Sequence, residues 1–261
     1  LSFFLACLCK EMALVLPMAV VAVRALRNDP MISWRERLSF WTSRDGVGLL
    51  LSIGAAGGIY LVLRVQSMPT LAHVDRTLAS EFTPWTHFIY VGRAVWFYIQ
   101  AGFFPFAELS PQHPLHVSSM GPSDTAKALA AYGISLFSLI LAAKTKGGFS
   151  LMMAAFILSL FPVVHIIPLS IGGNIGHERF LTLPLIFLTL AVVSALCAAR
   201  DKPTLPVLGM GGWLLLAFIN TAVTVPLWRN DLTLWSWAYQ THPETKFIQA
   251  SLLSAQVNSG D

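Results

Sequence analysis

Long apolar runs separated by short polar loops set the pattern of the chain. A helix needs about 20 residues to cross roughly 30 Å of hydrocarbon. Runs of about that length cover residues 1–23, 47–65, 125–143, 149–169, 180–199 and 206–227. A seventh candidate, 85–106, contains Arg93 and is bounded by two prolines. The pattern predicts an all-α polytopic membrane helical bundle of six or seven spans.

The pattern changes after the last apolar run, where the chain becomes more polar but keeps a helical spacing of apolar positions. It predicts one helix at 231–240, a break at His242–Pro243 and a second helix at 244–258, which Gly260 ends. This helix–turn–helix step has the length of about one helical repeat. A single unit of this kind cannot bury its own apolar face, so further repeats are expected.

Composition agrees with a membrane protein of two parts, a membrane module at 1–227 and the start of a repeat region at 228–261. Hydrophobic residues make up 55% of the 261 positions and charged residues only 11%, against roughly a quarter in soluble domains. The net charge of +4 comes from loop residues, and no basic patch points to nucleic acid. The three cysteines show no disulfide or metal spacing.

Loop charges predict an orientation. Basic residues gather in the loop 24–46 and in the short connections at 144–147 and 200–203, which the positive-inside rule assigns to the cytoplasm. With all three loops inside, 85–106 is a re-entrant or interfacial helix on the outer face, and the tail lies outside. The competing interpretation has seven spans and inverts every later loop. We favour the first because Arg93 is costly at mid-membrane.

Four stretches occur in an order that resembles one protein family. They read CKEMALVLP, FYIQAGFFPFAELSPQHP, FPVVHIIPL followed by GHERFLTLP, and WRNDLTLWSWAYQTHP. Together they resemble the C-terminal part of the membrane module in GT-C glycosyltransferases that carry C-terminal tetratricopeptide repeats. The animal transmembrane O-mannosyltransferases with such repeats are the best-known members. The resemblance covers nearly the whole chain.

The resemblance implies an enzyme that moves mannose or a similar hexose from a polyprenyl phosphate to a protein hydroxyl. Its active site would face the periplasm or the lumen of the endoplasmic reticulum, with the repeats holding the protein acceptor on that side. The catalytic acidic motif of the family, and the ligands of any divalent metal, would lie upstream of this chain. The chain does not begin with Met, and we interpret it as part of a longer protein whose catalytic base is elsewhere. No cofactor or metal site is predicted here.

The candidate phosphate-binding residues begin with Arg179, at the outer end of two predicted spans. A guanidinium forks onto phosphate oxygens better than an ammonium does. The alternative is that Arg179 pairs with Glu178 or reaches the lipid headgroups. His177 is a candidate lining residue beside them, and a structural hydrogen bond is its alternative role.

Lys10 and Glu11 form the second candidate group. Lys10 precedes Arg24 by 14 residues, which is about 21 Å of helix, so it falls in the outer half of its span. Ionisable groups at such depth face a cavity or a partner. They either line the outer-facing site or tie two spans together, for example Glu11 to Arg93. Arg93 itself contacts either a phosphate or a headgroup.

Two other functional classes stay open. A non-catalytic membrane anchor would present the repeats as a scaffold. A transporter or lipid flippase would show two similar halves with broken helices, and this chain has no such internal symmetry.

Overall fold

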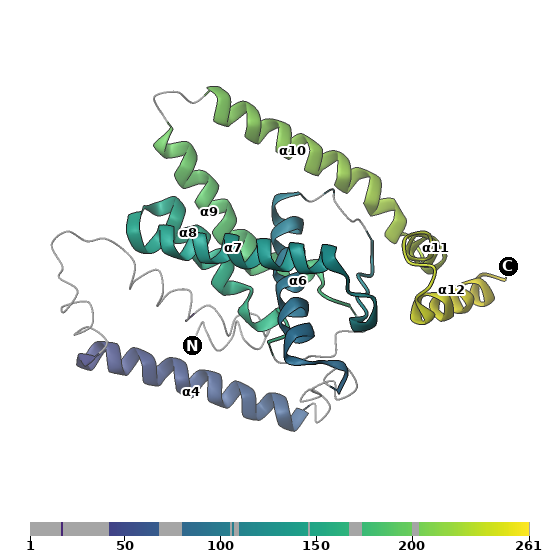
Figure 1. Ribbon diagram of the computed structural model, residues 1–261, viewed down its shortest axis with the longest axis horizontal. Helices are drawn as coiled ribbons and strands as arrows, with labels where there is room; N and C mark the ends of the chain where they lie inside the picture. Colours follow the sequence, from purple (N-terminus) through teal and green to yellow (C-terminus); the bar gives the residue numbers. More distant parts are fainter. Residues whose placement is uncertain are drawn as a thin grey trace.

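The computed structural model describes residues 17, 42–67, 80–104, 106, 110–145, 147–166, 174–199 and 204–260. Every regular element in these ranges is a helix (Figure 1). Of the predicted span 1–23, all but Pro17 lies outside the described residues, and so do Lys10, Glu11 and the arginines from Arg24 to Arg37.

The α-helices follow the predicted apolar runs and the predicted tail. Their bounds are α4 Arg44–Ser67, α6 Pro84–Phe103, α7 Pro122–Thr145, α8 Gly148–Ser159, α9 Thr182–Ala198, α10 Thr204–Thr224, α11 Asp231–Thr241 and α12 Lys246–Ser259. Short 3₁₀ segments connect them at η3 Val117–Ser119, η4 Phe161–Val163, η5 Glu178–Leu181 and η6 Val225–Trp228.

Three helices are long and apolar enough to cross a membrane within the described ranges. They are Pro122–Thr145, Glu178–Ala198 and Val207–Trp228, which match the predicted runs at 125–143, 180–199 and 206–227. An integral membrane protein is therefore compatible with the structure, whereas the full set of six or seven spans stays a prediction.

The predicted run 149–169 ends earlier than expected. Its apolar helix covers only Gly148–Val163, and the last turn is already the 3₁₀ segment η4. Pro162 lacks the N–H that an α-helix needs and crowds the preceding turn. His165 then takes the left-handed backbone conformation with φ 58°, so the chain turns instead of continuing.

Helix α6 forms the centre of the hydrophobic core and runs across α7 in Figure 1. Tyr90, Ala94 and Tyr98 are completely or almost completely buried along one helical stripe. They pack in one cluster with residues of α8 and α9, including Phe156 and Leu188. Most of the polar cleft described below is built on the outer side of this core.

The crossing of α6 and α7 depends on Gly92. A Cβ placed at Gly92 would lie 2.6 Å from the Cβ of Ala128 and 2.9 Å from its Cα. Any larger side chain would push the two helices apart. Tyr132 locks the same crossing, because its hydroxyl donates to the carbonyl of Phe88 at 2.7 Å and its ring stacks on the Phe88 ring.

The tail forms the predicted helix–turn–helix step. Asn230 caps α11 by accepting from the Thr233 N–H at 2.9 Å. Gly260 ends α12 with a φ of 81°, which glycine adopts without a Cβ clash. Trp235 and Phe247 pack edge to face at 5.6 Å between the two helices. The tetratricopeptide identity of this step stays a prediction.

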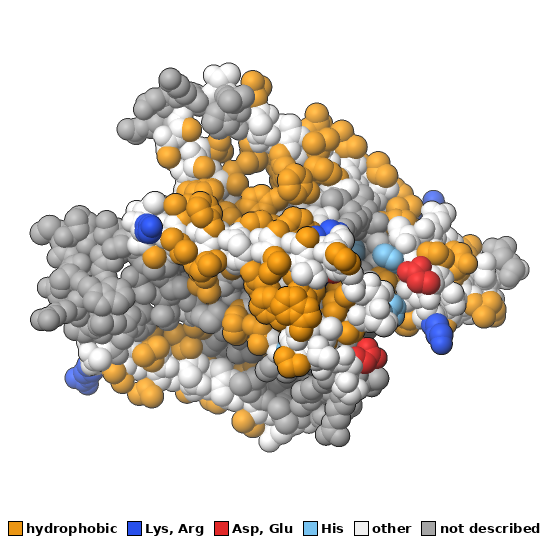
Figure 2. Space-filling model, in the orientation of Figure 1, with side chains coloured by type: hydrophobic (Ala, Val, Ile, Leu, Met, Phe, Trp, Pro, Cys, Tyr) orange, Lys and Arg blue, Asp and Glu red, His pale blue; other side chains and the backbone are white. Residues whose placement is uncertain are grey.

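The surface separates charged from apolar side chains. On the face in Figure 2, most Lys, Arg, Asp and Glu side chains lie towards the two ends, with a broad hydrophobic region between them. Exposed apolar side chains such as Phe137, Leu208 and Phe218 belong to the candidate spans. Soluble domains rarely expose such continuous apolar area, so lipid is the natural cover.

Substitution of Gly92 by alanine tests the helix crossing. We expect Gly92→Ala to destabilise the fold by about 1–3 kcal/mol, because the added methyl overpacks a contact with the α7 backbone. The measurement is the thermal midpoint of the detergent-solubilised protein. Gly133→Ala in α7 is the matched control, since no described atom lies within 4 Å of a Cβ built there. An equal midpoint for both variants would contradict the crossing.

Candidate functional site

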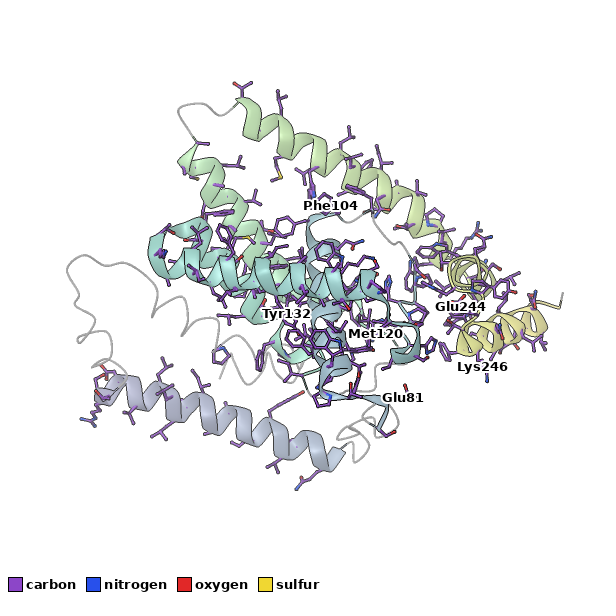
Figure 3. All side chains as sticks on the ribbon, viewed as in Figure 1. Glu81, Phe104, Met120, Tyr132, Glu244 and Lys246 are labelled. Atoms are coloured by element: carbon purple, nitrogen blue, oxygen red, sulfur yellow. The ribbon has the colours of Figure 1, made fainter. Side chains whose placement is uncertain are left out.

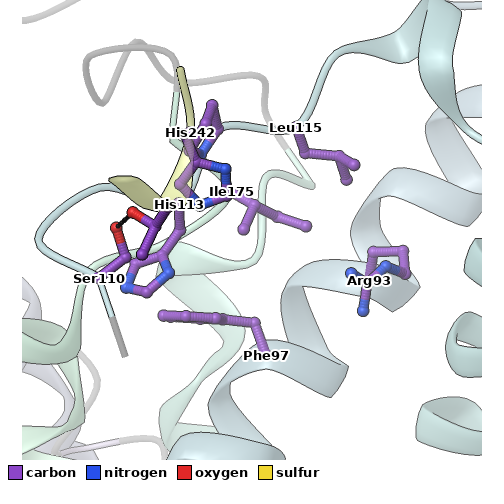
Figure 4. A pocket seen from close by; sticks show the side chains of 9 residues that line it. Arg93, Phe97, Ser110, His113, Leu115, Ile175 and His242 are labelled. Carbon is purple, nitrogen blue, oxygen red and sulfur yellow. Dashed lines mark hydrogen bonds between the residues drawn. The ribbon is translucent and has the colours of Figure 1, made fainter. Parts of the chain in front are cut away.

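A polar cleft of about 390 Å³ lies where the membrane module meets the tail (Figure 4). One wall is α6, the other is the loop at 110–115 with Ile175, and the turn after α11 closes one side. Its lining residues are Arg93, Phe97, Ser110, His113, Pro114, Leu115, Ile175, Thr241 and His242. The volume falls within the range of small-molecule sites.

Arg93 brings a largely buried guanidinium to this cleft. Its Nε donates to Asp124 Oδ1 at 2.8 Å, and the two side chains are only 11% and 19% exposed. Asp124 Oδ2 accepts from the Gly121 N–H at 2.9 Å, which fixes the carboxylate at the start of α7. Arg93 Nη1 is buried and has no hydrogen-bond partner among the described residues. Because a guanidinium carries five N–H donors, the pair with Asp124 does not use all of them.

His113 lies in the loop wall of the cleft and is held by Glu178. Its Nε2 lies 2.5 Å from Glu178 Oε1. Its ring packs 4.6 Å from the Phe97 ring, centroid to centroid. Because a carboxylate only accepts hydrogen bonds, Nε2 donates to it, and Nδ1 is the ring nitrogen left for a molecule in the cleft.

The segment around Asn174 fixes the backbone of His113. Asn174 Oδ1 accepts from the His113 N–H at 2.6 Å, and the Ile175 N–H donates to the His113 carbonyl at 2.9 Å. Gly176 follows at a close approach, since a Cβ there would lie 2.6 Å from the Phe97 ring. The glycine lets this segment press against α6, and the loop wall is held rigidly as a result.

Two of the predicted site residues belong to this site. Arg93 lines the cleft, and Glu178 is connected to it through a hydrogen bond with His113. The predicted tie of Arg93 to Glu11 cannot be followed, because Glu11 lies outside the described residues, but the partner observed for Arg93 is Asp124. The contact observed for Glu178 is with His113. In the sequence, Asp124 is 31 residues from Arg93, and His113 is 65 residues from Glu178.

His177 and Arg179 lie beside the cleft but do not line it. The His177 N–H donates to the Tyr98 hydroxyl at 3.3 Å, which joins the segment to α6. The Arg179 guanidinium carbon lies 5.0 Å from the centre of the Phe180 ring, and the side chain is exposed. Arg179 therefore lies at the surface next to Glu178, outside the cleft.

The tail docks on the loop wall through two hydroxyls. Ser110 Oγ and Thr241 Oγ lie 2.9 Å apart in a hydrogen bond, drawn as a dashed line in Figure 4. Ser110 is 5% exposed, whereas Thr241 is exposed, so the contact is partly buried. Figure 3 shows Glu244 and Lys246 just beyond it, at the turn into α12. The first tail helix thus ends at the cleft.

An apolar groove of about 570 Å³ opens at the far end of the same helix α6. It is lined by Gly102, Phe103, Phe104, Leu185, Leu188, Thr189, Val192, Val193, Leu196, Gly209, Met210, Trp213 and Leu214. Trp213 Nε1 donates to the Phe103 carbonyl at 2.7 Å, which ties α10 to the end of α6. The groove lies between helices of spanning length, where lipid chains are available.

Sequence reasoning did not find His113, Asp124 or the Ser110–Thr241 contact. His113 and His116 were visible as a pair in a proline-rich loop, but the carboxylate that His113 binds is 65 residues away. In the part of the chain that the structure describes, no group of three or more His, Cys, Asp or Glu is placed to hold a metal ion. The cleft itself presents a guanidinium, two imidazoles and two hydroxyls.

His165 anchors the connection behind the site. It is 2% exposed, and its Nε2 donates to the Ile175 carbonyl at 3.1 Å. Its own carbonyl accepts from His87 Nε2 at 2.8 Å. Burial away from water lowers the pKa of His165 from 6.5 to about 4, so the imidazole stays neutral in the folded protein.

Comparison of the chain with protein-family models, curated protein sequences and solved structures gave no significant match. The chemistry of the cleft is therefore inferred from its own side chains.

The buried imidazole of His165 makes stability depend on pH. Between about pH 6.5 and pH 4 the unfolded chain binds a proton that the folded chain does not, so stability falls as the pH falls through this window. We expect a loss of about 2 kcal/mol at pH 5 relative to pH 7 from this group. Asparagine accepts the left-handed conformation and does not titrate.

Thermal midpoints of wild type and His165→Asn at pH 7 and pH 5 measure this effect. The wild-type midpoint falls more steeply than that of the variant. Parallel pH dependence of the two proteins would rule out His165 as the source.

Proposed function

We propose that this chain is part of a membrane glycosyltransferase that moves a hexose, such as mannose, from a polyprenyl phosphate to a protein hydroxyl. Transfer takes place on the outer, periplasmic or lumenal side. The observation that carries the proposal is the largely buried side chain of Arg93, which lines the cleft from a helix whose far end lines an apolar groove.

The cleft supplies what a departing phosphate needs. As the bond from sugar to phosphate breaks, negative charge grows on the phosphate oxygens, and a fixed donor in a poorly solvated site stabilises that charge. Arg93 is held in place by Asp124, so little reorganisation is needed when the phosphate binds. His113 and His242 add further polar groups around the same space.

The groove supplies a place for the lipid. A polyprenyl chain is apolar along its length, and the groove between α9 and α10 has almost entirely apolar lining. Both sites lie on α6, the cleft at Arg93 and Phe97 and the groove at Gly102 to Phe104. Residues 93 and 102 are separated by about 14 Å along the helix axis, a distance that the polyprenyl chain would have to cover for its phosphate to lie in the cleft and its tail in the groove.

The tail supplies a route for the acceptor. Thr241 and His242 line the cleft directly, and the outer surface of α11 and α12 continues from it. A protein segment held by the tail would therefore deliver a serine or threonine hydroxyl to the phosphate-bound sugar.

A second candidate is a non-catalytic anchor that presents the tail to other proteins. The hydrogen bond between Ser110 and Thr241 favours it, because it joins the end of the first tail helix to the loop wall. Transfer of a labelled sugar by the full-length protein separates the two functions, since an anchor has no such activity.

Loss of the Arg93 charge tests the phosphate site. We expect Arg93→Gln to weaken binding of labelled undecaprenyl phosphate to the nanodisc-embedded full-length protein by 10-fold or more, since a charge-assisted hydrogen bond is worth about 1.5–3 kcal/mol. Because this variant leaves Asp124 without its partner, the double variant Arg93→Gln/Asp124→Asn removes the pair together and should bind equally weakly.

Arg229→Gln is the matched control, since Arg229 is exposed at the start of the tail. It removes the same charge away from the cleft and should keep wild-type affinity. Full affinity in a folded Arg93→Gln protein would overturn the phosphate site.

The orientation is tested with single cysteines in a chain whose Cys7, Cys9 and Cys197 are replaced by serine. Ser118 is exposed in the loop before α7, and Lys144 is exposed at its other end. We expect an impermeant thiol reagent applied to intact cells or sealed microsomes of known orientation to label Ser118→Cys only from the outer side. Lys144→Cys should react only after permeabilisation, and the reverse pattern would contradict the orientation.

A further inference from the structure

The pair formed by His113 and Glu178 has the geometry of a proton acceptor rather than of a surface ion pair. His113 is 7% exposed, whereas Glu178 approaches it from the more exposed side of the loop wall. The carboxylate holds Nε2–H and thereby fixes the tautomer that leaves a lone pair on Nδ1. An imidazole oriented by a carboxylate is a recurrent arrangement of general bases.

The position of the ring is fixed independently at four points. Asn174 and Ile175 hold the backbone of His113 from both sides, with distances of 2.6 and 2.9 Å. Phe97 covers one face of the ring. Glu178 is the first residue of η5. The residue before it, His177, donates its N–H to the Tyr98 hydroxyl. One such contact would be enough to hold a histidine with a purely structural role. His113 has several, and it lies at the wall of an open cleft.

The cleft places this imidazole opposite the proposed phosphate site. Arg93 of α6 and His113 of the loop both line it, with Phe97 between them in Figure 4. The hydroxyl-bearing Thr241 and the imidazole of His242 come from the tail side. A sugar phosphate held by Arg93 therefore has the imidazole on one side and the tail, which would present an acceptor, on another.

We infer that His113 is the group that takes the proton from the acceptor hydroxyl and that Glu178 positions it. This inference rests on the proposed function. The resemblance expects a base upstream of this chain, whereas here the base is a histidine of the chain itself. Its substrate is a serine or threonine hydroxyl next to a polyprenyl-phosphate sugar.

The step balances as a displacement at the anomeric carbon. The acceptor oxygen forms a bond to that carbon, while the bond from the carbon to the phosphate oxygen breaks. The polyprenyl phosphate leaves with the electron pair beside Arg93. The hydroxyl proton passes to His113 Nδ1, and the imidazolium then loses it to water.

The test uses membranes that contain the full-length protein and labelled mannosyl- or glucosyl-phosphoryl-undecaprenol, with label in the protein fraction as the readout. We expect His113→Gln to lower transfer at least 100-fold while undecaprenyl phosphate binding stays within about 2-fold. His116→Gln is the matched control, since His116 is exposed in the same loop and does not line the cleft. It should transfer at the wild-type rate.

Glu178→Gln provides a second test, which leaves the buried His113 unchanged. The charged and titratable groups near His113 are Arg93 of α6, Asp124 of α7 paired with it, Glu178 of η5, and His242 after α11. Removal of the Glu178 charge makes the imidazolium less stable. The acid limb of the pH–rate profile should therefore move to lower pH, with a lower maximal rate, and Glu178→Asp should restore part of the rate.

The possible results distinguish the assignment of His113 as the base from the proposed function. Wild-type transfer that persists in folded His113→Gln, or an unshifted profile in Glu178→Gln, overturns the base assignment and leaves the proposed function standing. A wild-type protein that neither binds the lipid phosphate nor transfers either sugar overturns the proposed function and the assignment with it.

Discussion

The close contact between Gly92 of α6 and Ala128 of α7 is the constraint on which the arrangement of the cleft depends. It lets α6 cross α7 at van der Waals distance, and the next residue, Arg93, then meets Asp124 one turn earlier on α7. Phe97 and Tyr98 follow on the same helix and receive Gly176 and His177. A side chain at position 92 would push the two helices apart, and the residues that follow on α6 would no longer meet their partners. The arginine would then sit buried without its carboxylate, which is costly in a poorly solvated site.

The cleft is made of segments that meet only in the folded chain. The loop wall is tied to the segment after α8 by an isolated bridge between Pro114 and Asn174, and to the tail by the contact of Ser110 with Thr241. Both contacts join segments that are far apart in the sequence, and the Ser110–Thr241 hydrogen bond is partly buried. Together they hold this irregular, proline-rich loop against the rest of the chain. They also explain why the tail and the membrane module share one site instead of forming two.

The helices of the chain were largely predictable, and the site was only partly so. Periodicity and length gave the helices at 125–143, 180–199 and 206–227, and the caps at Asn230 and Gly260 follow from local rules that act over a few residues. The predicted span 149–169 was longer than the observed helix, because hydrophobicity alone does not show that Pro162 ends the α-helix. Arg93 and Glu178 stood out as charges in apolar surroundings, but their partners Asp124 and His113 did not, since a pairing across 31 or 65 residues leaves no periodic trace. Lys10 and Glu11 lie outside the described residues.

The central claim is that the cleft between α6, the 110–115 loop and the tail receives the phosphate of a membrane lipid. Photo-crosslinking tests it most directly, with a polyprenyl phosphate that carries a photoreactive group beside the phosphate, bound to the full-length protein in nanodiscs and mapped by mass spectrometry. The account predicts cross-links on residues 93–97, 110–115 and 241–242, competed by unlabelled undecaprenyl phosphate. Cross-links spread over the exposed faces of α4 and α10, without competition and with none in those three segments, would contradict it.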